Sequence, residues 1–309
     1  SHILVEKEVF LDCNSLKQIL TYSPTNKLIE INDVKAFKNI NYPIYLKINV
    51  HNHSLIEVCF QNCVVSIEHK SFNGWSSLFS ITIPSSVTSI ESFAFYGCSS
   101  LNKIEIPPYT SSIGDFAFYG CSSLTQIEIP SSVTSIGDYA FYGCTSLTQV
   151  TIPSSLTSIG NYVFAECSLL AQVTIPSSIT LIGNGSFSSC SSLKKVLFDC
   201  HSSLTSIGNY AFYKCTSLEQ FTVPRSVVTI KVSAFSDCSS LQIVSFDTPS
   251  SIHSIEFYAF HNCIFLEHIS IPSPIAFIGA YAFNGCPILM EMSLSSSLKK
   301  AGYKSFDQH

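Results

Sequence analysis

The sequence predicts an α/β repeat solenoid: a right-handed coil of about twelve turns with a parallel β-sheet on one face. The first observation behind this prediction is a cysteine that recurs at steps of 23 or 25 residues, at positions 98, 121, 144, 167, 190, 215, 238, 263 and 286. The second is that a phenylalanine lies three residues before each of these cysteines and a leucine three residues after it. Such a period is typical of solenoids, because each turn buries its apolar edge only against its neighbours.

A strand is expected just after the leucine of each repeat. Ile104-Glu105-Ile106 and Ile127-Glu128-Ile129 alternate apolar and polar residues, which is the pattern of a half-buried strand. Proline follows most of these segments and has no amide hydrogen to donate, so the strand ends there. Parallel strands, one from each turn, should therefore form a single sheet.

The remainder of each turn is expected to return to the start of the next strand. In the turn from Ile129 to Thr151, a Ser-Ser pair makes the corner, and Val133-Thr134-Ser135-Ile136 runs back along the opposite side. Gly137-Asp138 then begins a tight helical turn that carries Ala140 and Phe141 inward. This helical turn supplies the α part of the predicted fold class.

These residues resemble a known family, the BspA-type leucine-rich repeats of the Treponema pallidum class. Its motif occurs here as Leu124-x-x-Ile127-x-Ile129-Pro130-x-Ser132-Val133-x-x-Ile136-Gly137-x-x-Ala140-Phe141-x-x-Cys144. The resemblance covers residues 67–309 and implies a leucine-rich repeat solenoid. It also implies a surface adhesin of the kind found in mucosal anaerobes and protozoan parasites, which binds matrix proteins, host epithelium or other microbes.

The chain is expected to have two parts. Residues 1–66 form degenerate N-terminal repeats or a cap, with an insertion near 38–52 where the register breaks. Residues 67–309 form the regular array, which is truncated within its last repeat because Phe306 lies 23 residues after Phe283 and the next strand is missing. The sequence is therefore interpreted as a piece of a longer protein.

Composition and motifs argue against several classes of function. Charged residues make up 12% of the chain, the net charge is −5 and Arg225 is the only arginine, so no basic stripe for nucleic acid exists. No glycine-rich nucleotide loop, zinc-protease motif or nucleophile elbow occurs, which predicts no catalytic residues, no enzyme activity and no cofactor. No stretch has the roughly 18 apolar residues of a membrane span.

The cysteines are expected to be free and buried rather than bridged. Equivalent side chains of neighbouring turns run parallel, so their Cβ atoms stay about 4.8 Å apart, farther than a disulfide prefers. Cys59 and Cys63 lie outside this column, and a local disulfide, two unpaired thiols or a metal site with nearby histidines remain open. Cys200 lies beside Asp199 and His201, but neighbours at a strand exit point different ways, so no catalytic pair and no metal site are assigned.

The candidate binding surface is the outward side of the predicted strands, five and seven residues after each cysteine. Side chains vary there while the inward columns repeat. The candidate ligand-binding residues are Gln126, Glu128, Gln149, Thr151, Gln172, Thr174, Lys195, Leu197, Gln220, Thr222, Ile243 and His268. Two alternatives are a solvated face without a partner and a binding site on the tyrosine row at 96, 119, 142 and 213.

The sequence thus favours a non-enzymatic recognition module, a fragment of a cell-surface or secreted adhesin that binds a protein or glycan on host or microbial surfaces. The alternative is a cytoplasmic scaffold that binds an intracellular protein, which the many free thiols favour. The sequence leaves the oligomeric state open.

Overall fold

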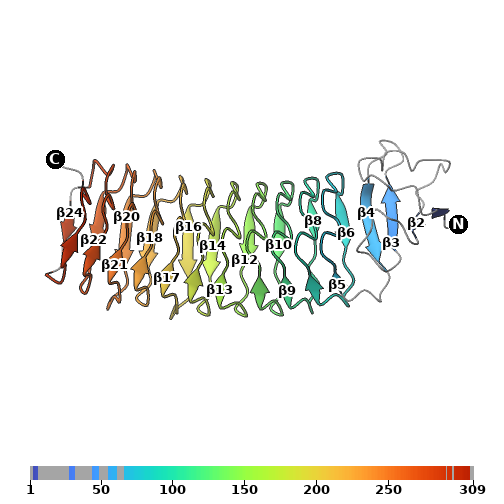
Figure 1. Ribbon diagram of the computed structural model, residues 1–309, viewed down its shortest axis with the longest axis horizontal. Coiled ribbons are helices and arrows are strands. Elements are labelled where there is room, and N and C mark those ends of the chain that lie inside the picture. Colours follow the sequence, from blue (N-terminus) through green and yellow to red (C-terminus); the bar gives the residue numbers. More distant parts are fainter. Residues whose placement is uncertain are drawn as a thin grey trace. The chain divides into compact units, whose positions relative to one another are not determined.

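The computed structural model describes residues 66–289, 291–293 and 296–306, and the backbone of four short strands nearer the N-terminus (Figure 1). The chain divides into two compact units, Ser1–Leu147 and Thr148–His309, which we call unit 1 and unit 2. The described repeats form a parallel β-solenoid of about ten turns of roughly 23 residues, without a helix. The twelve turns of the prediction included N-terminal repeats that fall mostly outside the described residues.

Unit 1 has strands on two sides of each turn. On the main side lie β6 (Ser80–Thr82), β8 (Lys103–Ile104) and β10 (Gln126–Glu128). On the opposite side lie β5 (Ser66–Ile67), β7 (Ser89–Ile90), β9 (Ser112–Ile113) and β11 (Ser135–Ile136), which form one parallel sheet. The return segment is therefore a strand as well, whereas the sequence predicted a sheet on one side only.

The N-terminal strands of unit 1 change direction. They are β1 (Ile3–Val5), β2 (Leu28–Ile31), β3 (Ile44–Ile48) and β4 (Leu55–Phe60). Strand β3 lies between β2 and β4 and is antiparallel to both, whereas β4 pairs with β6 in parallel. The expected insertion near 38–52 thus contains a strand that interrupts the parallel order of the sheet.

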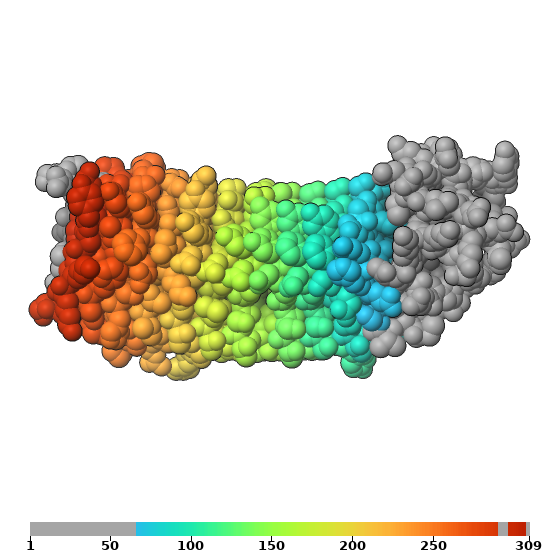
Figure 2. Space-filling model, in the orientation of Figure 1, coloured from blue at the N-terminus to red at the C-terminus, as the bar shows by residue number. Residues whose placement is uncertain are grey.

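Unit 2 repeats the two-sided arrangement. Its main side has β12 (Gln149–Thr151), β14 (Gln172–Ile175), β16 (Lys195–Phe198), β18 (Gln220–Val223), β20 (Ile243–Phe246), β22 (His268–Ser270) and β24 (Glu291–Ser293). The opposite side is one seven-stranded parallel sheet of β13 (Ser158–Ile159), β15 (Leu181–Ile182), β17 (Ser206–Ile207), β19 (Thr229–Ile230), β21 (Ser254–Ile255), β23 (Phe277–Ile278) and β25 (Lys300–Ala301). Within each unit, Figure 2 shows successive turns as narrow bands of colour, as expected when each turn packs on the next.

Columns of identical side chains fill the core between the two sides. In unit 1, Phe118 and Phe141 are completely buried and stack with ring centroids 5.2 Å apart, and in unit 2 Phe235 and Phe260 do the same at 5.1 Å. Trp75 takes the cysteine position 23 residues before Cys98, and its buried ring packs edge-on against Phe72. The apolar columns of the sequence are therefore the core.

The predicted helical turn before each cysteine is wrong. The six residues that precede a cysteine form consecutive tight turns, with left-handed backbone at two of the six positions. In the turn that ends at Cys121, these positions are Phe116 with φ 56° and Gly120 with φ 68°. A right-handed helix cannot continue through left-handed residues, so the fold is a β-solenoid without the α part.

Polar side chains at the corners bond to the next turn. The Asp115 carboxylate accepts a hydrogen bond from the Asp138 amide at 2.8 Å, and the Asn184 side-chain oxygen accepts one from the Asn209 amide at 2.9 Å. Each side chain satisfies a backbone donor that a 23- or 25-residue step brings within reach. The Gly-Asp and Gly-Asn pairs of the sequence thus link the turns rather than cap helices.

Candidate functional site

The predicted strand-face residues are exposed in both units. In unit 1, Gln126 and Glu128 flank the buried Ile127 on β10. In unit 2, the exposed candidate residues on β12 to β22 are Gln149, Thr151, Gln172, Thr174, Lys195, Leu197, Gln220, Thr222, Ile243 and His268. The alternation of the strands therefore places every candidate residue in solvent.

In unit 2, the strand register places Lys195, Leu197 and Ile243 next to residues whose side chains carry amide or hydroxyl groups. Lys195 lies beside Gln172, and Leu197 beside Thr174. Ile243 lies between Gln220 and His268 on the neighbouring strands. Leu197 and Ile243 are 48% and 44% exposed, so the face offers two apolar side chains in a polar surrounding.

The charges on the main side differ between the two units. In unit 1, the Lys103 ammonium donates a hydrogen bond of 2.8 Å to the Glu105 carboxylate, which raises the pKa of Lys103 and lowers the pKa of Glu105. In the described part of unit 2, Lys195 makes no ion pair, and the His268 ring lies 3.9 Å from the Glu267 carboxylate. The Lys195 ammonium is therefore available to a partner.

Two insertions at strand exits create a pocket that the sequence analysis did not predict. The amides of Asp199 and Ser203 donate hydrogen bonds to the carbonyls of Ile175 and Ser177 in the preceding turn. The two amides are four positions apart in the sequence, whereas the two carbonyls are only two positions apart. The amides of Asp247 and Ser251 repeat this pattern on Val223 and Arg225. The two extra residues of each 25-residue turn must therefore protrude between these anchor points.

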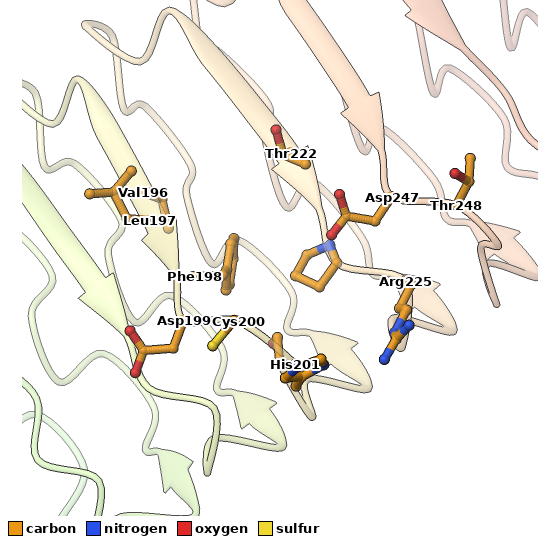
Figure 3. A pocket seen from close by; sticks show the side chains of 12 residues that line it. Val196, Leu197, Phe198, Asp199, Cys200, His201, Thr222, Arg225, Asp247 and Thr248 are labelled. Atoms are coloured by element: carbon orange, nitrogen blue, oxygen red, sulfur yellow. The ribbon is translucent and has the colours of Figure 1, made fainter.

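The pocket lies between these two protrusions. Its volume is about 590 Å³, and it is lined by Val196, Leu197, Phe198, Asp199, Cys200, His201, Ser202, Thr222, Pro224, Arg225, Asp247 and Thr248. In Figure 3, Asp199, Cys200 and His201 follow the end of β16, Asp247 and Thr248 follow β20, and Arg225 comes from the turn between them. The signal for this pocket in the sequence was the pair of steps of 25 residues.

The pocket contains no arrangement for nucleophilic catalysis. Cys200 is a free, exposed thiol, and no hydrogen bond joins Cys200, His201 and Asp199 to one another in the part of the chain that the structure describes. No group of three or more His, Cys, Asp and Glu side chains within the described ranges could hold a metal ion. The arrangement can bind a ligand, but it holds no base in contact with the thiol.

The predicted tyrosine row is only partly continuous. In unit 1, Tyr96, Tyr119 and Tyr142 are half-buried and stack with centroid distances of 4.7 and 4.8 Å. A second stacked row, Phe93, Phe116 and Tyr139, lies against the first. In unit 2, Tyr213 contacts Tyr210 edge-on. These rings brace the turns of unit 1, which fits a structural role better than an open docking surface.

The column of cysteines is free and buried, as predicted, at positions 98, 121, 144, 167, 190, 215, 238, 263 and 286. The Cys144 thiol donates a hydrogen bond to the Phe118 carbonyl at 3.3 Å, and Cys190 donates to Phe164 at 3.1 Å. Burial raises the pKa of each of these two thiols to about 12, against an ordinary value of 9.0. Cysteine therefore acts as a small core residue with one weak donor.

The predictions for the remaining thiols lie outside the described residues. Cys63 and the Cys59 side chain fall there, so the three alternatives for Cys59 and Cys63 stay predictions. Within the described residues, no helix is long and apolar enough to cross a membrane.

Comparisons with solved structures found matches over most of this chain. The pneumococcal vaccine antigen PcpA is 21% identical, with 91% of this chain and 86% of that chain covered and a TM-score of 0.55. A leucine-rich cell surface protein from Faecalibacterium prausnitzii A2-165 is 27% identical, with 82% and 88% covered and a TM-score of 0.44. A leucine-rich repeat protein of T. pallidum is 23% identical, with 80% and 87% covered and a TM-score of 0.45. A search of curated proteins found no match.

The family model described as "BspA type Leucine rich repeat region (6 copies)" matches residues 65–194, 111–242 and 196–309. These ranges contain all the turns with the stacked phenylalanine and the buried cysteine. The chain therefore belongs to the BspA-type leucine-rich repeat family.

Proposed function

We propose that this protein is a non-enzymatic recognition module of a cell-surface or secreted adhesin. Its partner is a protein or a glycan displayed on host or microbial surfaces, and the strand face binds it. Membership in a family of recognition repeats supports this proposal.

The single observation that carries the proposal is the contrast between the two sides of each main-side strand. The inward positions repeat the same buried residue types, whereas exposed positions change from Gln to Lys, Ile or His. Stacking requires constant inward residues but places no such demand on the outward ones. Two half-exposed apolar side chains within a rim of amides and hydroxyls also match the composition of protein interfaces.

The test is a pair of substitutions that place negative charges on this face. Lys195→Glu with Ile243→Asp should abolish binding of the purified protein to epithelial cells and to extracellular matrix. Both side chains are exposed, so the free energy of unfolding should change by no more than roughly 1 kcal/mol. Thermal unfolding should verify that the variant is folded.

The matched control carries the same charge change on the opposite side of unit 2. Lys299→Glu with Val228→Asp alters two exposed residues beside β25 and β19 and should leave binding intact. Equal binding by the strand-face variant and the wild-type protein would contradict the proposal, as would a wild-type protein that binds neither preparation.

An intracellular scaffold remains the second candidate function, because all ten cysteines that the structure describes are free. Nine of the ten are buried in the core, however, and burial alone explains why they form no disulfides, so the free thiols do not require an intracellular location. Antibody staining of intact, unpermeabilised cells separates the candidates: surface staining supports the adhesin, and staining only after permeabilisation supports the scaffold.

A further inference from the structure

The pocket between the two insertions combines an apolar wall with polar groups at its rim. Leu197 is 48% exposed, Phe198 is half-buried, and Val196 and Pro224 are buried beneath them. The Phe198 ring is held edge-on by Phe221, with centroids 5.7 Å apart. A volume of about 590 Å³ falls within the range of small-molecule sites, about 300–1,000 Å³.

The polar groups of the pocket are both donors and acceptors. Arg225 presents five N–H donors, and Asp247 presents a carboxylate that only accepts. Neither side chain makes an ion pair within the described residues, and both are exposed. The Thr222 hydroxyl is fixed by a hydrogen bond of 2.9 Å to Ser245, and Thr248 adds a second hydroxyl.

This set of groups selects a neutral ligand rich in hydroxyl groups. The Arg225 guanidinium would repel a cationic ligand, and the Asp199 and Asp247 carboxylates would repel an anionic ligand. An extended peptide needs a free strand edge, but β18 and β20 already pair in register. A sugar ring has hydroxyls that both donate and accept, and an apolar face that can cover Phe198.

We infer that this pocket binds one sugar unit of a neutral glycan. Arg225 and Asp247 would hold adjacent hydroxyls, and the ring would lie on the Phe198 side of the pocket. The distance between the two insertions fits a ligand of one sugar unit, because the insertions are two turns apart, about 10 Å at the usual strand spacing. Leu197 and Thr222 of the strand face also line the pocket, but Lys195 and Ile243, which the test of the strand face changes, do not, so the two proposals can be tested separately.

Cys200 gives a direct test because it is an exposed, free thiol in the pocket lining. The full chain is treated with iodoacetamide, and the alkylation rate of Cys200 is followed by peptide mass mapping. The probes are the methyl glycosides of glucose, galactose, mannose, fucose, N-acetylglucosamine and N-acetylgalactosamine. At least one neutral glycoside should slow alkylation of Cys200 in a saturable manner.

Two pocket variants should remove this protection. Arg225→Met and Asp247→Asn each delete a charged hydrogen-bonding group, which should weaken the apparent affinity for the glycoside by about tenfold or more. The matched controls Lys194→Met and Glu219→Gln change exposed charges outside the pocket and should keep full protection. The strand-face variant Lys195→Glu with Ile243→Asp should also keep it, which separates this test from that of the proposed function.

Three outcomes would overturn the inference. The first is that no neutral glycoside protects Cys200. The second is that glucuronate or tetra-alanine protects it while the neutral glycosides do not. The third is equal protection in the folded pocket variants and in the wild-type protein, since the glycoside would then bind elsewhere.

Discussion

Units 1 and 2 share the same buried columns but differ at one backbone position of most turns. In the described turns of unit 1, the residue before the cysteine position is glycine, at 74, 97, 120 and 143. In unit 2, only the turn that ends at Cys286 keeps a glycine there among the described turns, Gly285, whereas the others have Glu166, Ser189, Lys214, Asp237 and Asn262, with φ between 57° and 60°. The stacking of the columns therefore imposes a left-handed backbone even on residues that disfavour it.

The two units also differ at the strand exits. The described turns of unit 1 all have a step of 23 residues, whereas two turns of unit 2 have 25 and protrude around the pocket. The phenylalanine column continues unchanged through both long turns, with Phe187, Phe212, Phe235 and Phe260 stacked in sequence. Unit 2 thus acquires new surface features while this column is kept.

The largest expected effect tests whether both units depend on the phenylalanine column. Phe141→Ala in unit 1 and Phe235→Ala in unit 2 should each lower the free energy of unfolding by about 3–5 kcal/mol, because each removes a completely buried ring. Denaturant unfolding measures this loss. Hydrogen exchange should rise first in the turns next to the substitution. Equal increases near residues 141 and 270–289 after Phe141→Ala would contradict nearest-neighbour packing.

The next effect concerns the buried thiols and alkaline pH. Burial raises the pKa of Cys144 from 9.0 to about 12, so the unfolded chain loses this proton first as pH increases. The stabilisation is complete below pH 9.0 and is lost as the pH rises from there toward 12, by about 1.4 kcal/mol per pH unit for each thiol. Cys144→Ala should therefore lose less stability between pH 9 and 10 than the wild-type protein under reducing conditions. Identical losses would contradict a buried thiol.

A smaller effect should appear when the left-handed residues of the two units are exchanged. Ser189→Gly in unit 2 should stabilise the protein, and Gly120→Ser in unit 1 should destabilise it, each by about 0.5–1 kcal/mol. The Cβ of the new serine would lie 3.8 Å from Gly97, so the backbone rather than a clash determines the sign. Melting temperatures measure both changes. Shifts of the same sign would contradict the view that a residue other than glycine destabilises this left-handed position in both units.

Much of this fold could be predicted because the repeat period alone identifies the inward columns. The burial of Cys144, Phe141 and Leu147 needed no further information. The helical turn was predicted wrongly because Phe116 and Tyr139 carry no sequence signal of a left-handed backbone, which the hydrogen bonds between turns impose.

The candidate site was predictable to a similar degree. Strand alternation was sufficient to place Lys195 and Ile243 in solvent. The pocket was not predicted, because the sequence places the extra residues at the strand exits but does not show in which direction they protrude. Their direction depends on the anchor bonds of Asp199, Ser203, Asp247 and Ser251.

We propose that the core columns support the fold and that the outward residues of unit 2 carry recognition. Five residues after the cysteine position, Gln occurs at 126, 149, 172 and 220. Unit 1 departs from it with Ser80 and Lys103, and unit 2 departs from it with Lys195, Ile243, His268 and Glu291. The most direct measurement is binding to epithelial cells and matrix by the triple variant Lys195→Gln, Ile243→Gln and His268→Gln. Because these residues are exposed and lie outside the pocket, we predict loss of binding with an unfolding free energy within roughly 1 kcal/mol of the wild-type value. Full binding by the folded triple variant would contradict the claim.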